Sequence, residues 1–420
     1  MAEIGVTETS CDGGKRSRQG GTVKRIYVIG TVDTKGEELD FLAARIAALG
    51  GKPVLIDVGT TPAGTEAEIS AAEVARHGAG GTEAELASGD RGRAVAAMAD
   101  AFSRFIQTRN DIAGIIGIGG GGGTSIVTAG MRELPLGLPK IMVSTLASGD
   151  VSPYVGVSDI VMVPSITDLA GLNRISRVVL SNAAQAIAGM AANPAEIEDG
   201  RPAIGLTMFG VTTPCVTAIS EQLRDRYDCL VFHATGTGGR TMEKLADSGM
   251  LDGVIDITTT EMCDLLFGGV LAAGEDRLDA IARTGLPYVG SAGALDMVNF
   301  WAPETVPERY RDRLFYRHNS NVTLMRTTAD ECRQIGQWIG RKLSACEGPM
   351  HFLIPEKGVS ALDIEGGAFF DPEADAALFD AIETSLKPAP NRRIERLPLH
   401  INDPEFAEAA VAAFLAIVKQ

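Results

Sequence analysis

The chain has 420 residues, 45% of them hydrophobic, and a formal net charge of −16 at pH 7. This length predicts two or three domains, and the acidic charge argues against a nucleic-acid partner or an anionic membrane surface, because both require basic patches. The sequence has no run of about 18 apolar residues that could form a transmembrane helix. Its six cysteines lack CxxC or zinc-like spacing, which predicts reduced thiols and a cytoplasmic location.

Residues 1–23 precede the first predicted strand. They lack the apolar segment of a signal peptide, and we expect a disordered tail. From residue 24 onward, short apolar runs alternate with segments whose apolar residues follow helical spacing. A long helix over residues 172–191 closes this half. The apolar runs predict strands at residues 24–30, 52–59, 111–118, 140–145 and 159–165.

The polar, proline-containing segment 191–202 separates this half from a second one. After it the pattern restarts, and the last helix has Asp403 as N-cap and Pro404 as its first residue. We therefore predict one domain over residues 24–195 and another over residues 196–420. Strand-like runs of the second half lie at residues 202–210, 227–236, 253–260, 286–293, 321–327, 350–358 and 392–401.

Strands that are apolar along their whole length and alternate with helices indicate a parallel sheet covered on both faces. The predicted fold class is α/β, with two Rossmann-like, doubly wound and mainly parallel domains facing a cleft. For the first domain we predict the flavodoxin-like strand order 2-1-3-4-5. Ligands of such sheets bind outside the carboxyl ends of the strands, here at the switch point between strands 1 and 3.

The stretch GIIGIGGGGGT, residues 114–124, places five consecutive glycines between a strand and a predicted helix that begins near Thr124. The N–H groups of such a run and the positive end of the helix form an anion site. Loops rich in Gly, Ser, Thr and Asp follow other strands at residues 31–38, 144–150 and 165–171. We expect these loops to meet at one edge of the sheet and to bind a phosphate group there.

The glycine run has two possible roles, which are binding of a ligand and close packing of the loop. Residues 117–122 formally match G-x-G-x-x-G, but the next strand has no acid at its tip for a ribose, which argues against a dinucleotide. The Walker A pattern is absent, which excludes the P-loop class but not nucleotide binding. Close packing of loop against helix would also explain glycines here. Lys35 either reaches a phosphate across the switch point or is solvated in its loop.

The second half carries polar loops of its own. The GTGG sequence at residues 236–239 is another candidate anion site. His233 fits a packed structural histidine better than a catalytic one, whereas either role suits His318. No catalytic motif stands out, so catalytic residues and metal ligands stay unassigned. Acid–base, metal or nucleophilic chemistry is open to five further residues, although solvated carboxylates and a buried thiol are favoured for them: Glu261, Asp264, Asp363, Glu365 and Cys215.

Six spaced motifs resemble the ATP-binding domain of the tomato-mosaic-virus resistance protein family and its largely uncharacterised bacterial relatives. They run from about Arg25 to the C-terminus and are RIYVIGTVDTKGEELDFLAARI, IIGIGGGGGTS, VSTLASGDVSPYVG, PSITDLAGLNRIS, HATGTGGRTMEKL and PEKGVSALDIEGG. The resemblance implies two Rossmann-like halves, with ATP and magnesium (Mg²⁺) bound in the first. It also implies self-association, so we expect a homo-oligomer such as a dimer. The plant protein's additional C-terminal barrel domain has no match here, so antiviral activity is not transferred.

The expected function is therefore that of an ATP-binding protein. The phosphates would be held by residues 119–124 and by the TVDTKG sequence at residues 31–36. One alternative is an ATP-dependent enzyme whose second ligand, a small acidic or carbonyl metabolite, lies in the interdomain cleft. Another is an NAD-dependent oxidoreductase. The resemblance implicates these residues in nucleotide binding: Thr31, Asp33, Thr34, Lys35, Gly119, Gly120, Gly121, Gly122, Thr124, Ser144, Thr145, Ser148, Gly149, Asp150, Ser165, Thr167 and Asp168.

Overall fold

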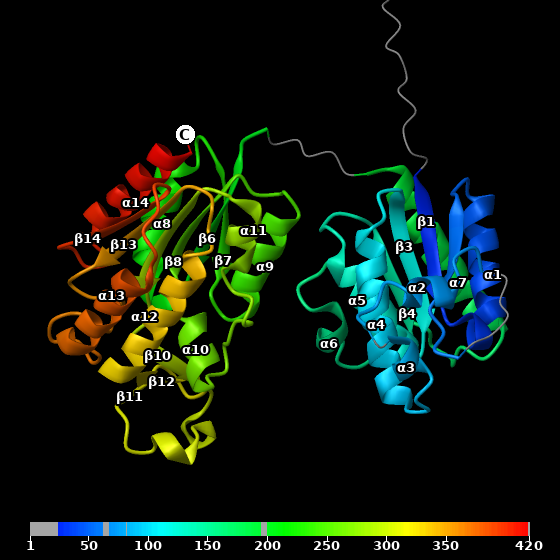
Figure 1. Ribbon diagram of the computed structural model, residues 1–420, viewed down its shortest axis with the longest axis horizontal. Coiled ribbons are helices and arrows are strands. Elements are labelled where there is room, and N and C mark those ends of the chain that lie inside the picture. Colours follow the sequence, from blue (N-terminus) through cyan, green and yellow to red (C-terminus); the bar gives the residue numbers. More distant parts are fainter. Residues whose placement is uncertain (1–23, 62–66, 81, 195–199, 419–420) are drawn as a thin grey trace, which may run out of the picture. The chain divides into compact units, whose positions relative to one another are not determined.

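A computed structural model describes residues 24–61, 67–80, 82–194 and 200–418. The chain divides into two compact units, each built on its own parallel sheet (Figure 1). This confirms the predicted α/β class with two Rossmann-like domains. The predicted tail at residues 1–23 and the predicted boundary between residues 195 and 196 lie outside the described residues. The cleft between the domains stays a prediction.

The first unit contains a five-stranded parallel sheet in the order β2-β1-β3-β4-β5, as predicted. Its central strand β3 is apolar and almost wholly buried, because helices cover both faces. The register places Gly119, at the end of β3, beside Ser144 of β4. The strands are β1 (Arg25–Gly30), β2 (Pro53–Asp57), β3 (Ile112–Gly119), β4 (Lys140–Ser144) and β5 (Val161–Pro164).

Helices lie on both faces of this sheet (Figure 1). On one face, Leu42 and Ile46 of α1 belong to the same core as Leu180 of α7. On the other face α5 packs so closely on β3 that a Cβ on Gly117 would lie 2.4 Å from the Val127 side chain. The helices over residues 24–194 are α1 (Val32–Ala48), α2 (Ala71–Ala75), α3 (Thr82–Leu86), α4 (Arg91–Gln107), α5 (Gly121–Glu133), α6 (Ser152–Val155) and α7 (Arg174–Ala192).

Two helices begin earlier than the sequence analysis predicted. Helix α1 starts at Val32, so the TVDTKG sequence forms a helical turn with a break at Lys35 (φ −131°, ψ 16°) rather than a loop. Helix α5 starts at Gly121 rather than near Thr124, so three of the five glycines lie in its first turn. Packing of α5 on the sheet outweighs the low helix propensity of glycine, which costs about 1 kcal/mol per residue.

The second unit contains a six-stranded parallel sheet in the order β14-β13-β9-β8-β6-β7. From β7 onward this order repeats the 2-1-3-4-5 pattern of the first unit and adds one strand. The strands are β6 (Ala203–Met208), β7 (Asp228–His233), β8 (Gly253–Thr258), β9 (Tyr288–Gly293), β13 (Met350–Pro355) and β14 (Arg392–Leu397).

The helices of the second unit also form two layers. Helices α8 and α14 share a core that contains Ile219 and Phe414, and α9, α12 and α13 share another that contains Met242, Ile335 and Leu378. No helix in the described part of the chain is both long and apolar enough to span a membrane. The helices are η1 (Gly210–Thr212), α8 (Thr213–Leu223), α9 (Thr237–Asp247), α10 (Glu261–Phe267), α11 (Asp279–Thr284), η2 (Pro303–Thr305), η3 (Glu308–Tyr310), α12 (Ala329–Leu343), α13 (Pro372–Ser385) and α14 (Pro404–Ile417).

The second unit also contains a three-stranded antiparallel sheet that the sequence analysis did not predict. Its order is β10-β12-β11, and its strands are β10 (Met297–Phe300), β11 (Phe315–Arg317) and β12 (Thr323–Arg326). The predicted strand at residues 321–327 is therefore β12, which belongs to this small sheet rather than to the parallel one. Strands of three or four residues are too short to show a reliable alternation of apolar and polar side chains.

Candidate functional site

A pocket of about 500 Å³ lies at the carboxyl ends of β1 and β3, the switch point of the first sheet. We call it the glycine pocket. The first turns of α1, α4 and α5 and the residues that follow β2 form its walls. It is lined by Thr31, Asp33, Thr34, Lys35, Thr60, Thr61, Leu86, Gly89, Asp90, Arg91, Ala94, Val95, Gly120, Gly121, Gly122, Gly123 and Ile126.

The N-terminus of α5 borders the glycine pocket. The first N–H groups of a helix, here from Gly121 onward, have no partner within the helix. A Cβ on Gly120 would lie 3.7 Å from the nearest atom and one on Gly121 3.8 Å, and neither residue has a positive φ. Neither packing nor backbone conformation therefore requires glycine at these two positions. Glycine at positions 120 and 121 leaves open space beside the unpaired N–H groups.

Gly119 differs from the glycines that follow it. A Cβ on Gly119 would lie 2.9 Å from backbone atoms of Gly123 and Thr124. Contacts this short are forbidden, so the close approach of β3 to α5 requires glycine at position 119. Packing thus explains Gly119, which does not line the pocket, whereas it leaves Gly120 and Gly121 unexplained.

Two cationic side chains line the same pocket. Lys35 lies at the break in α1, and Arg91 is the first residue of α4. Neither side chain has a hydrogen-bond or ion-pair partner within the part of the chain that the structure describes. These cations and the unpaired helix N–H groups favour an anionic ligand, and the carboxylates of Asp33 and Asp90, which also line the pocket, oppose one.

Hydrogen bonds at the end of β2 hold the first turn of α1 in place. Buried Asp57 accepts hydrogen bonds from the N–H groups of Val32 (3.0 Å) and Gly59 (2.9 Å). The hydroxyls of Thr31 and Thr34 lie 2.8 Å apart in the same turn. The sequence analysis missed Asp57, although an acid that directly ends an apolar strand, as in VLIDVG, was a visible signal.

The sequence analysis also missed the contribution of α4. Asp90 is its N-cap, and its carboxylate accepts hydrogen bonds from the N–H groups of Gly92 (2.8 Å) and Arg93 (3.1 Å). A helix that connects parallel strands runs antiparallel to them, so it begins at the carboxyl edge of the sheet. The N-cap signal in SGDRGR could therefore have placed Arg91 near the switch point.

The structure brings only part of the predicted set into the glycine pocket. Thr124 and Ser144 are fully buried, and their hydroxyls pair with each other at 2.7 Å, joining α5 to β4. The predicted residues that line the pocket are Thr31, Asp33, Thr34, Lys35, Gly120, Gly121 and Gly122. Those that do not line it are Gly119, Thr124, Ser144, Thr145, Ser148, Gly149, Asp150, Ser165, Thr167 and Asp168.

The predicted anion site at GTGG is occupied by the protein's own carboxylate. Fully buried Glu261 accepts hydrogen bonds from the N–H groups of Gly236 (2.7 Å) and Gly239 (3.0 Å) at the start of α9. A Cβ on Gly239 would lie 2.1 Å from Glu261 Oε2, so this contact requires glycine. These N–H groups are therefore not available to a ligand, which corrects the prediction.

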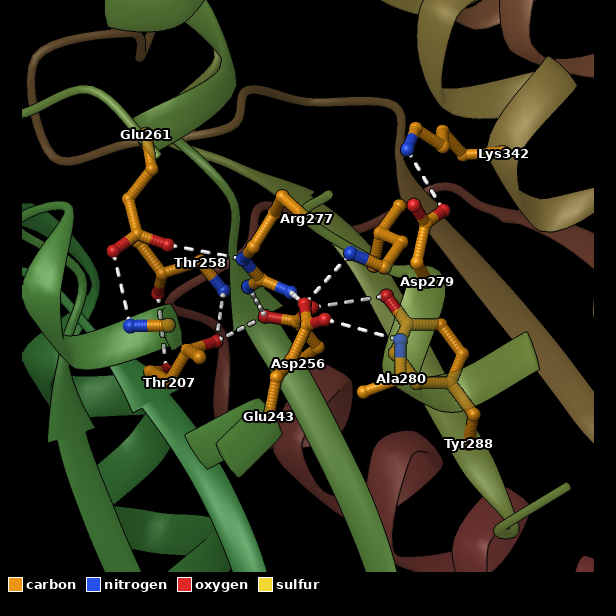
Figure 2. Close-up of polar contacts among 12 residues, drawn as sticks. Thr207, Glu243, Asp256, Thr258, Glu261, Arg277, Asp279, Ala280, Tyr288 and Lys342 are labelled. Atoms are coloured by element: carbon orange, nitrogen blue, oxygen red, sulfur yellow. Dashed lines mark hydrogen bonds and ion pairs between the residues drawn. The ribbon is translucent and has the colours of Figure 1, made fainter. Parts of the chain in front are cut away.

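Arg277 connects Glu261 to two further carboxylates. Its fully buried guanidinium lies 2.8 Å from Glu243, 2.9 Å from Asp256 and 3.1 Å from Glu261 (Figure 2). Asp256 also accepts a hydrogen bond from the Tyr288 hydroxyl at 3.1 Å. Burial opposes the charge of Arg277, but the three carboxylates outweigh it and raise the pKa of Arg277 well above its ordinary value. We call these four charged side chains the Arg277 cluster.

Three of the four candidate carboxylates of the second half are buried, so the solvated role favoured for them is wrong for Glu261, Asp264 and Asp363. Asp264 accepts hydrogen bonds from the N–H groups of Asn299 (2.7 Å) and Leu271 (2.8 Å), and burial raises its pKa to about 7. Asp363 is fully buried and accepts a hydrogen bond from the N–H of Val359 (2.9 Å). Only Glu365 of this set is exposed.

The thiol and the two histidines have different environments. Burial raises the pKa of Cys215 to about 12, which confirms a buried thiol rather than a reactive thiolate. The ring of His233 stacks on Phe209 with centroids 5.4 Å apart, yet His233 is exposed rather than packed in the core. His318 is also exposed. No group of three or more His, Cys, Asp or Glu side chains in the described residues could hold a metal ion.

The structure defines a two-unit, Rossmann-like α/β protein with a pocket beside the N-terminus of α5 in its first unit. The chain belongs to the uncharacterised protein family UPF0261, whose N-terminal domain model matches residues 24–196 and whose C-terminal domain model matches residues 201–418. A UPF0261 protein of Mesorhizobium japonicum is 74% identical over 94% of this chain and 100% of its own length. A UPF0261 protein of Clostridium tetani is 45% identical over 94% of this chain and 100% of its own length.

A plant relative confirms the predicted likeness to the tomato-mosaic-virus resistance proteins. The ToMV resistance protein Tm-1(GCR237) of Solanum lycopersicum is 42% identical over 94% of this chain, which spans 56% of that relative's length. The ATP-binding part of the resemblance stays a prediction. The glycosyltransferase SnogD from Streptomyces nogalater covers 93% of this chain and 99% of its own, but 12% identity and a TM-score of 0.20 are too low to support any inference.

Proposed function

We propose that the first unit binds ATP in the glycine pocket, with the phosphates at the N-terminus of α5. The observation that carries this proposal is the convergence of unpaired N–H groups at Gly121 with the side chains of Lys35 and Arg91 on one pocket at the switch point. Helix N-termini favour anions, and each such charge contributes about 0.3–1 kcal/mol when exposed. The choice of ATP among phosphate compounds rests on the family resemblance.

The size and the remaining lining of the pocket suit a nucleotide. Its volume of about 500 Å³ lies within the range of small-molecule sites, about 300–1,000 Å³. Leu86, Ala94, Val95 and Ile126 supply an apolar wall, against which a base can pack. The hydroxyls of Thr31 and Thr34 supply hydrogen bonds near the phosphates.

Magnesium fits the same pocket as a partner of the phosphates. Asp33 and Asp90 are the carboxylates that line it, and Asp90 already caps α4. Mg²⁺ in nucleotide sites is usually held by phosphates, waters and one or two carboxylates. We therefore assign Asp33 as the side chain that would meet Mg²⁺, directly or through water. When bound, the ion would neutralise phosphate charge.

The two enzymatic alternatives have less support than ATP binding alone. In a Rossmann dinucleotide site an acid at a strand end binds the ribose, but Asp57 accepts hydrogen bonds from backbone N–H groups. This disfavours an NAD-dependent oxidoreductase. An ATP-dependent enzyme remains an alternative whose second substrate and catalytic residues are unassigned. Self-association rests on the resemblance, and light scattering of the purified chain would test it.

Calorimetric titration of the full chain with MgATP and the Gly121→Val variant tests the proposal. The variant has room for its side chain in the unliganded protein, because a Cβ on Gly121 meets nothing closer than 3.8 Å. We expect the melting temperature to stay within about 2 °C and the affinity for MgATP to fall at least about 100-fold, which corresponds to about 2.7 kcal/mol.

Gly210→Phe in the second unit serves as the matched control, because Gly210 also has open space around its Cα and no positive φ. It should bind MgATP like the parent. The proposal fails if Gly121→Val binds MgATP with parental affinity, or if the parent binds NAD at micromolar concentration and releases no heat with MgATP.

A further inference from the structure

A second cavity, of about 590 Å³, lies within the second unit. We call it the aromatic pocket. Phe209 and His233, which stand at the carboxyl ends of β6 and β7, form one side, and residues of the three-stranded sheet form the other. It is lined by Phe209, Gly210, Val211, His233, Thr235, Val270, Leu271, Asn299, Phe300, Trp301, His318, Asn319, Val322 and Leu324.

The aromatic pocket occupies the position at which open α/β sheets bind ligands. Strand β6 lies between β7 and β8, and the helices that follow β6 and β8, which are α8 and α10, belong to different hydrophobic cores. The switch point of the second sheet therefore lies between the carboxyl ends of β6 and β8. The residues directly after β6, Phe209, Gly210 and Val211, all line the pocket.

Flat aromatic surfaces dominate the pocket. The rings of Phe209 and His233 stack with an interplanar angle of 30° and centroids 5.4 Å apart. Trp301 is 49% exposed, which is unusual for the largest apolar side chain unless its ring borders a binding surface. These rings offer stacking surface to a planar ligand, and Val211, Leu324 and their neighbours enclose it with aliphatic groups.

None of the described residues that line the pocket is Asp, Glu, Lys or Arg. A charged ligand group enclosed there would lose its hydration without gaining a charged partner, and this is strongly unfavourable. The polar groups that line the pocket, on His233, Thr235, Asn299, His318 and Asn319, can exchange hydrogen bonds with an uncharged group. The lining therefore selects against acidic and basic molecules.

We propose that the aromatic pocket binds an uncharged, planar aromatic molecule that carries a hydroxyl or amide group. This ligand is distinct from the nucleotide of the first unit, and its binding does not depend on the proposed function. The aromatic part stacks beside Phe209 and Trp301, and the polar group meets the histidine, threonine and asparagine side chains.

Three probes with the same fused-ring size test this proposal: 2-naphthol, the anion 2-naphthoate and the non-planar decahydro-2-naphthol. The full chain has two tryptophans, so a Trp338→Phe background leaves Trp301 as a local fluorescence reporter. We expect 2-naphthol to change the Trp301 emission saturably and to bind at least about tenfold tighter than either other probe. Equal or tighter binding of 2-naphthoate, or no saturable response to 2-naphthol, would overturn the proposal.

Two variants locate the binding in the pocket. Gly210→Phe has room for its Cβ and fills the pocket with a ring, so 2-naphthol affinity should fall at least about tenfold while MgATP binding persists. Phe209→Leu keeps an apolar surface and removes a ring, so the preference for 2-naphthol over decahydro-2-naphthol should shrink. Gly121→Val should bind 2-naphthol like the parent. Parental affinity of both Gly210→Phe and Phe209→Leu for 2-naphthol would show that the probe binds elsewhere and would refute the assignment.

Discussion

Helices α5 and α9 both begin in glycine-rich turns at the carboxyl ends of parallel strands, one in each unit. At α5 the first N–H groups border a pocket together with the side chains of Lys35 and Arg91, which have no partner among the residues that the structure describes. At α9 the N–H groups of Gly236 and Gly239 donate to Glu261, and Arg277 binds that carboxylate in turn. The same arrangement therefore holds an internal anion in the second unit, whereas in the first unit we propose that it holds an external one.

This difference cannot be read from the glycines themselves. GGGGGT and GTGG are both plausible anion sites in the sequence, and the deciding residue, Glu261, lies 25 residues after Gly236. A helix N-terminus binds a ligand only where the fold leaves it without a carboxylate partner. The two units can thus share a strand order while their pockets differ in position and polarity: charged side chains of both signs line the glycine pocket, whereas none of the described residues that line the aromatic pocket is Asp, Glu, Lys or Arg.

The largest effect should come from removing the cation that supports the internal anion. Arg277→Met keeps most of the side-chain volume but leaves the carboxylates of Glu243, Asp256 and Glu261 buried without their partner. Removing one member of a buried ion pair costs about 3–5 kcal/mol. We expect a loss of this size in the free energy of unfolding, measured with urea.

Arg283→Met provides the matched control for Arg277→Met. Arg283 pairs with Asp247 at 2.8 Å, but its side chain is 55% exposed, and exposed ion pairs contribute about 0–1 kcal/mol. Equal destabilisation by the two substitutions would show that Arg277 stabilises the fold no more than a surface arginine does.

The sequence predicted the first unit well because its strands are continuous apolar runs. β3 and β4 are buried on both faces, so hydrophobicity alone locates them, and the right-handed rule for crossover connections leaves few possible strand orders. The first residues of the helices were harder to predict from the sequence. Whether Val32 and Gly121 are helical depends on Asp57 and on packing against the sheet, which are contacts between segments far apart in the sequence.

For a related reason, only part of the lining of the glycine pocket was predicted from the sequence. Lys35 and the glycines lie directly after strands, where topology alone places them at the switch point. Arg91 enters the pocket from a helix whose start depends on a connection of more than thirty residues after β2. The aromatic pocket was not predicted, because Asn299, Phe300 and Leu324 come from strands of four residues, and because Phe209 and Trp301 carry no motif.

A second prediction contrasts Lys35 with Arg277. Lys35 has no partner within the described residues, so its removal should cost ligand affinity rather than stability. We expect Lys35→Ala to weaken MgATP binding about tenfold, or about 1.4 kcal/mol, and to leave adenosine affinity and the melting temperature unchanged. Calorimetry with both ligands measures this difference.

Lys52→Ala is the control for Lys35→Ala, because Lys52 is exposed and directly precedes β2, at the opposite edge of the sheet. It should bind MgATP like the parent. If Lys35→Ala weakened adenosine and MgATP equally, or lowered the melting temperature by several degrees, Lys35 would support the fold rather than a phosphate.

The last and smallest effect is a pH dependence of the free energy of unfolding. It arises because the second unit contains further buried carboxylates. Asp296 accepts a hydrogen bond from Ser360 at 2.7 Å, and burial raises its pKa to about 7, with Arg326 opposing the rise and Asp363 adding to it. In the unfolded chain the pKa of Asp is about 3.9. The folded state therefore binds more protons between these values, so this contribution to stability is complete below about pH 4 and is lost as the pH rises through about 7.

Asp296→Asn cannot ionise and should remove that dependence. We expect the free energy of unfolding of the parent to fall by about 1 kcal/mol more than that of Asp296→Asn between pH 6 and pH 7, measured with urea at both values. Asp330→Asn, at a side chain that is 87% exposed, should follow the parent. Parallel pH profiles for the parent and Asp296→Asn would mean that Asp296 ionises in the folded protein as it does in water. The buried anions of the second unit would then be balanced at neutral pH, as Glu261 is by Arg277.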